Sequence, residues 1–320
     1  NEEGTLWSPG IRDNVKPNSW YHTHECFGPV LGIMRADTLE EAIKLQNSTG
    51  FGLTGGIHSL DQDEIDYWRE NVEVGNAYVN RGITGAIVER QSFGGWKDSA
   101  IGSGAKAGGP NYVAQQGVWA DGDLSQVPSV SLDPAINRAL RDILSTVELS
   151  DEDREWLQKA AHLDALAWRE EFNVEHDRTA LLCETNVFRY RPLLQPLQVR
   201  IGADFKLRDV LRLQLAALIT ESPVRFSASQ DTAVALAKAG IKVDVVSDAE
   251  FAAEIRKDSG VRIRTVGKVS DDLYPAAAES SSVVLDQPVL ADGRRELLPF
   301  LLEQAVATTQ HRFGVIGKKI

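Results

Sequence analysis

Two parts of the chain alternate short apolar runs with longer amphipathic stretches. In the second part, residues 224–229, 242–246 and 262–266 are predicted as strands, and residues 230–239 and 248–257 as helices. A helix between two strands forms a crossover connection, which places the strands parallel in one sheet. The order strand, helix, strand, helix, strand therefore predicts the α/β class, with half of a doubly wound sheet in this part.

The same alternation occurs near the N-terminus. Residues 30–34, 55–59 and 77–80 are predicted as strands, the first of them buried, and residues 38–47 and 61–71 as helices. This order again implies a largely parallel sheet. Functional sites in such sheets lie at the carboxyl ends of the strands. We therefore expect a site just after residue 80.

The two parts are separated by residues 115–131, which are rich in Gly, Pro, Ser and Asp and are predicted as a linker. Helices are expected beyond it at residues 134–146, 150–172 and 207–220. A chain of 320 residues with 42% hydrophobic residues has enough material for two cores. We predict two domains, residues 1–118 and residues 119–320.

Net charge and cysteine content narrow the class of protein. The formal net charge of −12 argues against a nucleic-acid surface. No apolar run reaches the roughly 18 residues of a membrane helix. Cys26 and Cys183 form neither a metal pattern nor a disulfide framework, which suits a reducing cytoplasm. His22, His24 and Glu25 lack a further ligand at suitable spacing, so no metal is predicted.

The chain opens on Asn1, and its only methionine is Met34, inside a predicted strand. We therefore expect the chain to be part of a longer polypeptide. Its expected partner is the upstream part of that same polypeptide.

An acidic residue, an aromatic ring and a Gly-Pro turn, Glu25 to Pro29, precede the first predicted strand. Glu25 can accept hydrogen bonds from two sugar hydroxyls, and the Phe27 ring can cover an apolar face. This pair is predicted to hold a nucleotide. The alternative is that it forms only the entrance of a buried strand.

Five motifs in order, residues 6–10, 25–31, 47–56, 75–81 and 91–99, resemble the C-terminal third of the NAD(P)-dependent aldehyde dehydrogenases. More narrowly, residues 84–88 and 104–110 are similar to L-glutamate γ-semialdehyde (1-pyrroline-5-carboxylate) dehydrogenase, in particular to the module of the bifunctional proline utilization A proteins.

The resemblance implies the identity of the domains. Residues 1–118 would be the C-terminal part of an aldehyde dehydrogenase catalytic domain, including the strand of an oligomerisation flap. Residues 119–320 would be a second doubly wound domain resembling a degenerate cofactor domain, with a terminal packing motif at residues 303–314. In that domain the turn at residues 227–231 lacks glycine and carries Asp231, so no nucleotide is expected there.

The resemblance also implies roles for single residues. Glu25 and Phe27 would bind NAD, and Gly85 and Ala86 would anchor the α-carboxylate of glutamate γ-semialdehyde. Phe93 would pack against the aliphatic stem of that substrate. The residues alone indicate only that small side chains let backbone N–H groups approach a ligand. A tight loop without a ligand explains them as well.

No catalytic residue is predicted in this chain. The family places its nucleophile in a Gly-Gln-x-Cys loop, which is absent here, and its general base is also upstream. Cys26 and Cys183 are predicted to be structural, since neither has a neighbour that would lower its pKa.

The predicted function is the C-terminal portion of an NAD-dependent glutamate γ-semialdehyde dehydrogenase in proline catabolism. In a bifunctional, substrate-channelling parent, FAD would serve an upstream proline dehydrogenase half. The alternatives are a monofunctional aldehyde dehydrogenase with an appended domain, and a non-catalytic lid or assembly module. The chain could form homo-oligomers. Peripheral membrane association is an option for the full-length parent only.

Overall fold

The computed structural model describes residues 3–100, 102–312 and 315–316. Its strands are β1 (Gly10–Arg12), β2 (Val30–Gly32), β3 (Phe51–Gly52), β4 (Thr54–Ile57), β5 (Asn76–Val79), β6 (Trp96–Lys97), β7 (His176–Asp177), β8 (Glu184–Pro192), β9 (Leu197–Ile201), β10 (Val224–Ala228), β11 (Asp244–Val245), β12 (Arg262–Val266), β13 (Val283–Leu285), β14 (Leu301–Thr309), β15 (His311–Arg312) and β16 (Val315–Ile316). Its helices are α1 (Trp20–Thr23), α2 (Leu39–Asn47), α3 (Gln62–Asn71), α4 (Pro134–Thr146), α5 (Asp151–Ala167), α6 (Leu207–Thr220), α7 (Gln230–Lys238), α8 (Asp248–Lys257), α9 (Leu273–Glu279) and α10 (Gly293–Glu296). The predicted α/β class is confirmed.

Several helices begin where a short polar side chain accepts hydrogen bonds from the first turn. Asp61 accepts from the amides of Asp63 and Glu64 at the start of α3, and Ser150 accepts from Asp153 at the start of α5. Ser247 and Glu250 form a reciprocal capping box at α8. These caps satisfy amides that have no partner within the helix, so local sequence sets where the helices begin.

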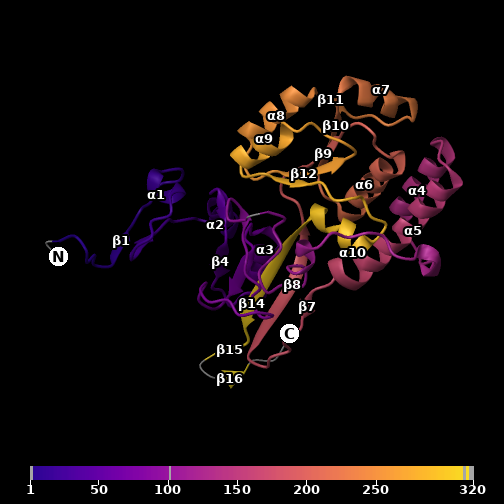
Figure 1. Cartoon of the computed structure of the whole chain (residues 1–320). Coiled ribbons are helices and arrows are strands. Elements are labelled where there is room, and N and C mark those ends of the chain that lie inside the picture. The colour runs from indigo at the N-terminus through magenta and orange to yellow at the C-terminus, as the bar shows by residue number, and fades with distance from the viewer. Residues whose placement is uncertain (1–2, 101, 313–314, 317–320) are drawn as a thin grey trace.

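One sheet has the order β11-β10-β9-β12-β13, and all its pairings are parallel. In chain order this is 3-2-1-4-5, the arrangement of a doubly wound sheet with β9 at its centre. One face packs against α6 and α7, with α4 and α5 behind α6, and the other face against α8 and α9 (Figure 1). The predicted half-sheet began at residue 224. The structure begins it one strand earlier, at β9.

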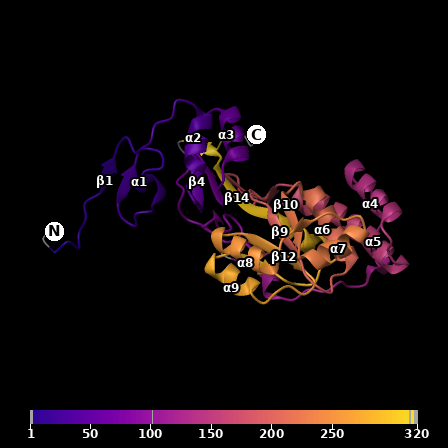
Figure 2. The ribbon, with the colours of Figure 1, turned by 90° about the horizontal axis from the view of Figure 1, so that it is seen from above.

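The second sheet has the order β4-β5-β14-β8-β7 and joins segments far apart in the chain. β14 pairs in parallel with β5 and antiparallel with β8 over its whole length, from Leu301 opposite Pro192 to Thr309 opposite Glu184. Figures 1 and 2 show β14 running from the doubly wound part to the sheet beside α2 and α3. Residues from both sides of position 118 thus build this sheet, and the division there stays a prediction.

The terminal motif predicted at residues 303–314 includes most of β14. Glu303 and Gln304 on this strand are buried, and Trp96 Nε1 donates to the Glu303 carbonyl at 2.8 Å. Gln310 donates its amide to the Cys183 carbonyl at 2.9 Å. Residues 313 and 314 lie outside the described residues.

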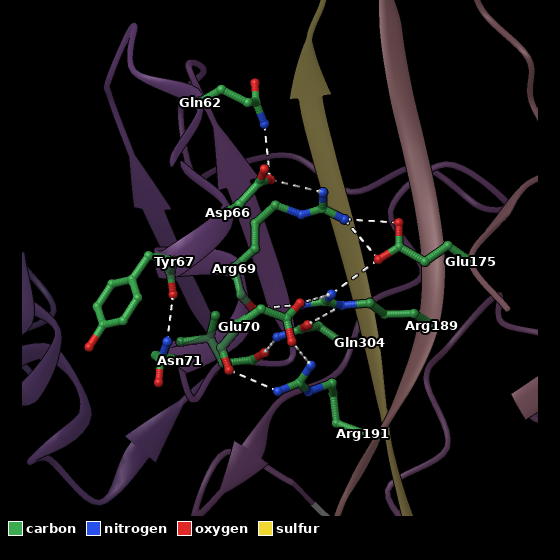
Figure 3. Close-up of polar contacts among 11 residues, drawn as sticks. Gln62, Asp66, Tyr67, Arg69, Glu70, Asn71, Glu175, Arg189, Arg191 and Gln304 are labelled. Carbon is green, nitrogen blue, oxygen red and sulfur yellow. Dashed lines mark hydrogen bonds and ion pairs between the residues drawn. The ribbon is translucent and has the colours of Figure 1, made fainter. Parts of the chain in front are cut away.

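A network of charged side chains ties α3 to β8 and β14 (Figure 3). Arg189 on β8 is 6% exposed, and its Nε donates to Gln304 Oε1 at 2.8 Å. Its Nη1 donates to Glu70 Oε1 at 2.8 Å and to Glu175 Oε1 at 3.1 Å. Arg69 pairs with Glu175 from the other side. Arg189 Nη2 donates to the Arg69 carbonyl at 2.5 Å. Each nitrogen of the Arg189 guanidinium thus has an acceptor, as a buried cation requires.

The N-terminal segment differs from the prediction. The strand expected to be buried at residues 30–34 is β2, which is exposed along its length and, among the described residues, pairs only with β1. Figures 1 and 2 show β1 and α1 standing away from both sheets. The apolar run alone could not indicate this, because burial needs a packing partner. No helix within the described ranges is long and apolar enough to cross a membrane.

Replacing Arg189 by methionine should destabilise the chain. The substitution leaves the buried Gln304 oxygen without its donor and removes hydrogen bonds to two carboxylates, at a cost of about 1.5–3 kcal/mol. Urea unfolding measures the loss. Arg35→Met is the matched control, because Arg35 pairs with Asp13 at 3.0 Å on the surface, where such pairs contribute at most about 1 kcal/mol. Equal losses in the two variants would contradict a structural role for the network.

Candidate functional site

The candidate site is the loop that follows β5, where the strand reaches the carboxyl edge of its sheet. Asn80 turns the chain there with a left-handed φ of 56°. Its side-chain amide donates to the Ser59 carbonyl at 2.8 Å and accepts from the Ser59 amide at 3.0 Å. The ends of β4 and β5 are therefore joined, and the loop starts from a rigid base.

Gly85 and Ala86 lie exposed in the middle of this loop. Gly85 has φ +81°, a conformation that favours glycine, and its carbonyl accepts from the Tyr78 hydroxyl at 3.2 Å. Within the described residues, the backbone amides of Gly85 and Ala86 donate no hydrogen bond. Two unused N–H groups side by side on a fixed loop can bind a carboxylate.

The far end of the loop is held by Gln91 and Phe93. Buried Gln91 donates to Asn186 Oδ1 on β8 at 2.6 Å. Phe93 exchanges two backbone hydrogen bonds with Ala107, at 3.0 and 2.8 Å, while its side chain is 42% exposed. The backbone of Phe93 is therefore fixed by hydrogen bonds, while its ring is partly exposed and accessible to a ligand.

A buried polar group supports the loop from below. Lys106 Nζ donates to Asn76 Oδ1 at 3.0 Å and to the Gly94 carbonyl. Asn76 in turn donates to the Ser92 carbonyl at 3.1 Å and accepts from the Gly94 amide at 3.1 Å. Hydrogen bonds from Asn76 and Lys106 thus fix the backbone of residues 92 and 94, on either side of Phe93.

Burial shifts the titration of the Lys106 group. Desolvation lowers the pKa of Lys106 to about 7, against the attraction of Glu303. Desolvation also raises the pKa of the Glu303 carboxyl. That carboxyl accepts from the Lys106 backbone amide at 2.8 Å and from Asn111 Nδ2 at 2.7 Å. The two shifts share one cause, the removal of water by β14 and the loop.

The structure adds residues that the sequence did not single out. Arg81 pairs with Glu184 at 2.8 Å, which anchors the foot of the loop to β8. Lys106 and Glu303 lie in segments already noted for their resemblance, but nothing in the sequence indicated that they meet. Lys106 and Glu303 meet because β14 lies beside β5 in the sheet.

Glu25 and Phe27, the predicted NAD residues, lie between α1 and β2. Figure 1 shows α1 standing away from the sheet that contains β4. Phe27 is 96% exposed, and Glu25 forms no ion pair or side-chain hydrogen bond within the described part of the chain. A free carboxylate beside an open ring fits the hydroxyls and apolar face of a ribose. Gly85, Ala86 and Phe93, by contrast, lie on one loop between β5 and β6.

The two cysteines remain apart and unbonded, Cys26 partly buried and Cys183 exposed. Within the described ranges, no group of His, Cys, Asp and Glu side chains is arranged to hold a metal ion.

The doubly wound sheet has its crevice between the carboxyl ends of β9 and β12. The predicted first turn, residues 227–231, follows β10; the first turn of the sheet instead follows β9 and contains Gly202. Ala203 and Lys268 form two backbone hydrogen bonds across this crevice, at 2.8 and 2.7 Å. A Cβ at Gly202 would overlap the Lys268 carbonyl. Backbone thus fills the place where a nucleotide binds in such folds, and the absence of a nucleotide site stays a prediction.

The low pKa of Lys106 predicts a pH dependence of stability. Above pH 7 the folded protein holds this amine neutral, while the unfolded chain keeps it protonated up to about pH 10.4. The unfolded state binds more protons in this window, so stability rises with pH by about 1.4 kcal/mol per unit.

Thermal unfolding from about pH 7 to about pH 9.5 tests this. The stability of the wild type relative to Lys106→Met should rise across the range. Lys44→Met, which replaces an exposed lysine, is the control, and the stability of the wild type relative to this variant should stay constant. Parallel curves for the wild type and Lys106→Met would show that the amine does not titrate in this window.

Comparisons with known proteins address the family. Residues 1–116 match the model of the aldehyde dehydrogenase family. The 1-pyrroline-5-carboxylate dehydrogenases of Bacillus pumilus and Bacillus thuringiensis are 40% and 42% identical over 112 residues, which is 35% of this chain and 21% of each relative. The structure of proline utilization A from Corynebacterium freiburgense is 55% identical with a TM-score of 0.79, and the match covers 99% of this chain and 29% of that one.

The chain therefore spans about a fifth of the curated relatives and less than a third of the structural one. The match to proline utilization A extends through both sheets, since it covers 99% of the chain. These findings confirm the predicted resemblance: residues 1–116 carry the sequence of the aldehyde dehydrogenase family, and the chain as a whole is similar to a part of proline utilization A.

Proposed function

We propose that this chain is the C-terminal portion of an NAD-dependent dehydrogenase that oxidises L-glutamate γ-semialdehyde to L-glutamate in proline catabolism. The observation that carries the proposal is the loop after β5, where the amides of Gly85 and Ala86 make no other hydrogen bond in the described residues. Similarity to 1-pyrroline-5-carboxylate dehydrogenases over the same segment supports it.

The loop would recognise the substrate at the end far from its aldehyde. The two amides donate to the α-carboxylate, and the exposed side of the Phe93 ring covers the aliphatic stem. Lys106 and Asn76 hold the backbone of Ser92 and Gly94, on either side of Phe93, in place for this contact. Such positioning fixes the aldehyde relative to a nucleophile.

When bound, NAD supplies the hydride acceptor. On this chain Glu25 would hold the ribose hydroxyls and Phe27 would cover an apolar face of the nucleotide. The Gly-Gln-x-Cys loop that carries the nucleophile in the family is absent from this sequence, so we assign the nucleophile and the general base to the upstream part of the same polypeptide.

Similarity to proline utilization A over 99% of the chain favours a bifunctional, substrate-channelling parent. In that parent an upstream proline dehydrogenase half would use FAD. The acidic charge and two unbonded cysteines support a cytoplasmic setting.

A structural role for the C-terminal part is a second proposal, and the sheet supports it. β14 pairs with β5 on one side and with β8 on the other. Side chains of β8 and β14 contact the loop or its supports, namely Glu184, Asn186 and Glu303. The C-terminal part would thus assemble the substrate loop without performing chemistry.

Replacing Ala86 by proline removes one loop amide with little change in side-chain bulk. In the full-length enzyme, kcat/KM for glutamate γ-semialdehyde should fall roughly 10- to 150-fold, the equivalent of a charge-assisted hydrogen bond. A neutral aldehyde of similar length should lose far less, because it has no carboxylate to anchor. Ala86→Ser keeps the amide and is the matched control. Equal losses for both aldehydes would show that the loop does not read the carboxylate.

Replacing Glu25 by glutamine keeps the shape and removes the charge. The dissociation constant of NAD should rise by an amount equivalent to about 1.5–3 kcal/mol. Fluorescence titration of the full-length enzyme measures it, with Glu40→Gln on the exposed face of α2 as control. An unchanged dissociation constant in Glu25→Gln would remove this residue from the NAD site.

A further inference from the structure

A cavity of about 330 Å³ lies between the segment at residues 103–119 and the segment at residues 283–303. Gly85, Ala86 and Phe93 do not line it. Much of its wall is aliphatic, from Leu285, Pro288, Leu290, Leu298 and Leu301. A cavity of this size with an apolar wall and a few polar groups has the form of a small-molecule site.

Two arginines line this wall, and one of them is Arg295. Its guanidinium carbon lies 4.2 Å from the centroid of the Trp119 ring, which holds the side chain in one orientation. Within the described residues it forms no ion pair, and its Nη1 is buried without a hydrogen-bond partner. Arg264, the other arginine of the wall, is already paired with Glu296 at 3.0 Å. Arg295 is therefore a fixed cationic donor available to a carboxylate.

Asn111 and Glu303 are two of the hydrogen-bond acceptors in the wall, which also contains Asp286. Asn111 is 3% exposed, and its Nδ2 donates to the Tyr190 hydroxyl at 3.0 Å and to Glu303 Oε1 at 2.7 Å. These bonds set the orientation of the amide and leave Asn111 Oδ1 buried without a partner. A buried polar atom without a partner costs about 1–3 kcal/mol. A ligand with a hydrogen-bond donor would remove this cost.

We propose that this cavity binds a small aliphatic amino acid. The ligand's carboxylate pairs with Arg295, its ammonium group donates to Asn111 Oδ1 beside the Glu303 carboxylate, and its side chain packs among the leucines. A simple carboxylic acid would leave Asn111 Oδ1 unpaired, and a simple amine would leave Arg295 unpaired. The inference does not rest on the dehydrogenase activity, since it concerns binding at a separate place in the fold.

Isothermal titration of the full-length protein with L-leucine tests the proposal. Two matched probes each lack one charge, 4-methylpentanoate without the ammonium group and 3-methylbutylamine without the carboxylate. We expect L-leucine to bind at one site per chain and each truncated probe to bind about tenfold or more weakly, the loss of one charge-assisted hydrogen bond.

Three variants locate the site. Arg295→Met keeps the length of the side chain and should weaken L-leucine binding about tenfold or more. Ala105→Leu fills part of the cavity, leaves every polar group in place and should abolish binding. Arg256→Met is the control, since Arg256 pairs with Glu279 on the surface of α8 and does not line the cavity; its affinity should equal that of the wild type. A thermal melt of each variant verifies folding.

Three results would overturn the proposal. The first is no binding of L-leucine at millimolar concentration. The second is binding that persists unchanged in both Arg295→Met and Ala105→Leu, which places the ligand elsewhere. The third is equal affinity for L-leucine and 4-methylpentanoate, which removes the amino acid as the ligand.

Discussion

The pairing of β14 with β5 is the interaction on which the rest of the structure depends. Four residue pairs, from Ala305 opposite Asn76 to Thr308 opposite Val79, join the end of the chain to the strand that leads into the substrate loop. β14 also pairs along its whole length with β8. Without β14, β5 would lose a neighbour on one side, and the buried side chains of Asn76 and Tyr78 would lose the cover of that strand.

β14 places the carboxylate of Glu303 in the interior, where it accepts hydrogen bonds from the substrate loop's support and from the wall of the cavity. Glu303 accepts from the Lys106 amide below the loop and from Asn111 at the wall of the cavity. Removing water makes each hydrogen bond stronger and each unpaired polar group costlier. Order in the loop and order in the cavity are therefore coupled through one carboxylate. A ligand in the cavity would act on the side chain that also positions Lys106.

Local sequence predicted most of the regular structure. α4, α6, α8 and β12 begin and end where the apolar periodicity placed them, since caps and hydrophobic faces are local signals. The loop residues Gly85, Ala86 and Phe93 were also named from their motif, although their role stays a proposal. The prediction that residues 30–34 are buried was wrong, because an apolar run does not reveal whether another element packs against it. The start of the doubly wound sheet was placed one strand late, because periodicity does not tell which strand is central.

The sequence by itself determined the α/β class, the alternation of strands and helices in two parts of the chain, and the resemblance of the N-terminal part to the aldehyde dehydrogenases, because these follow from short-range periodicity and from motifs. Tertiary structure alone decided which distant segments meet. Lys106 joins Asn76 and Glu303 across 30 and 197 positions of chain, and Asn111 meets Tyr190 across 79. Such contacts depend on the packing of a whole sheet, and the hydrogen-bonding capacity of a side chain does not specify which partner it finds once water is excluded.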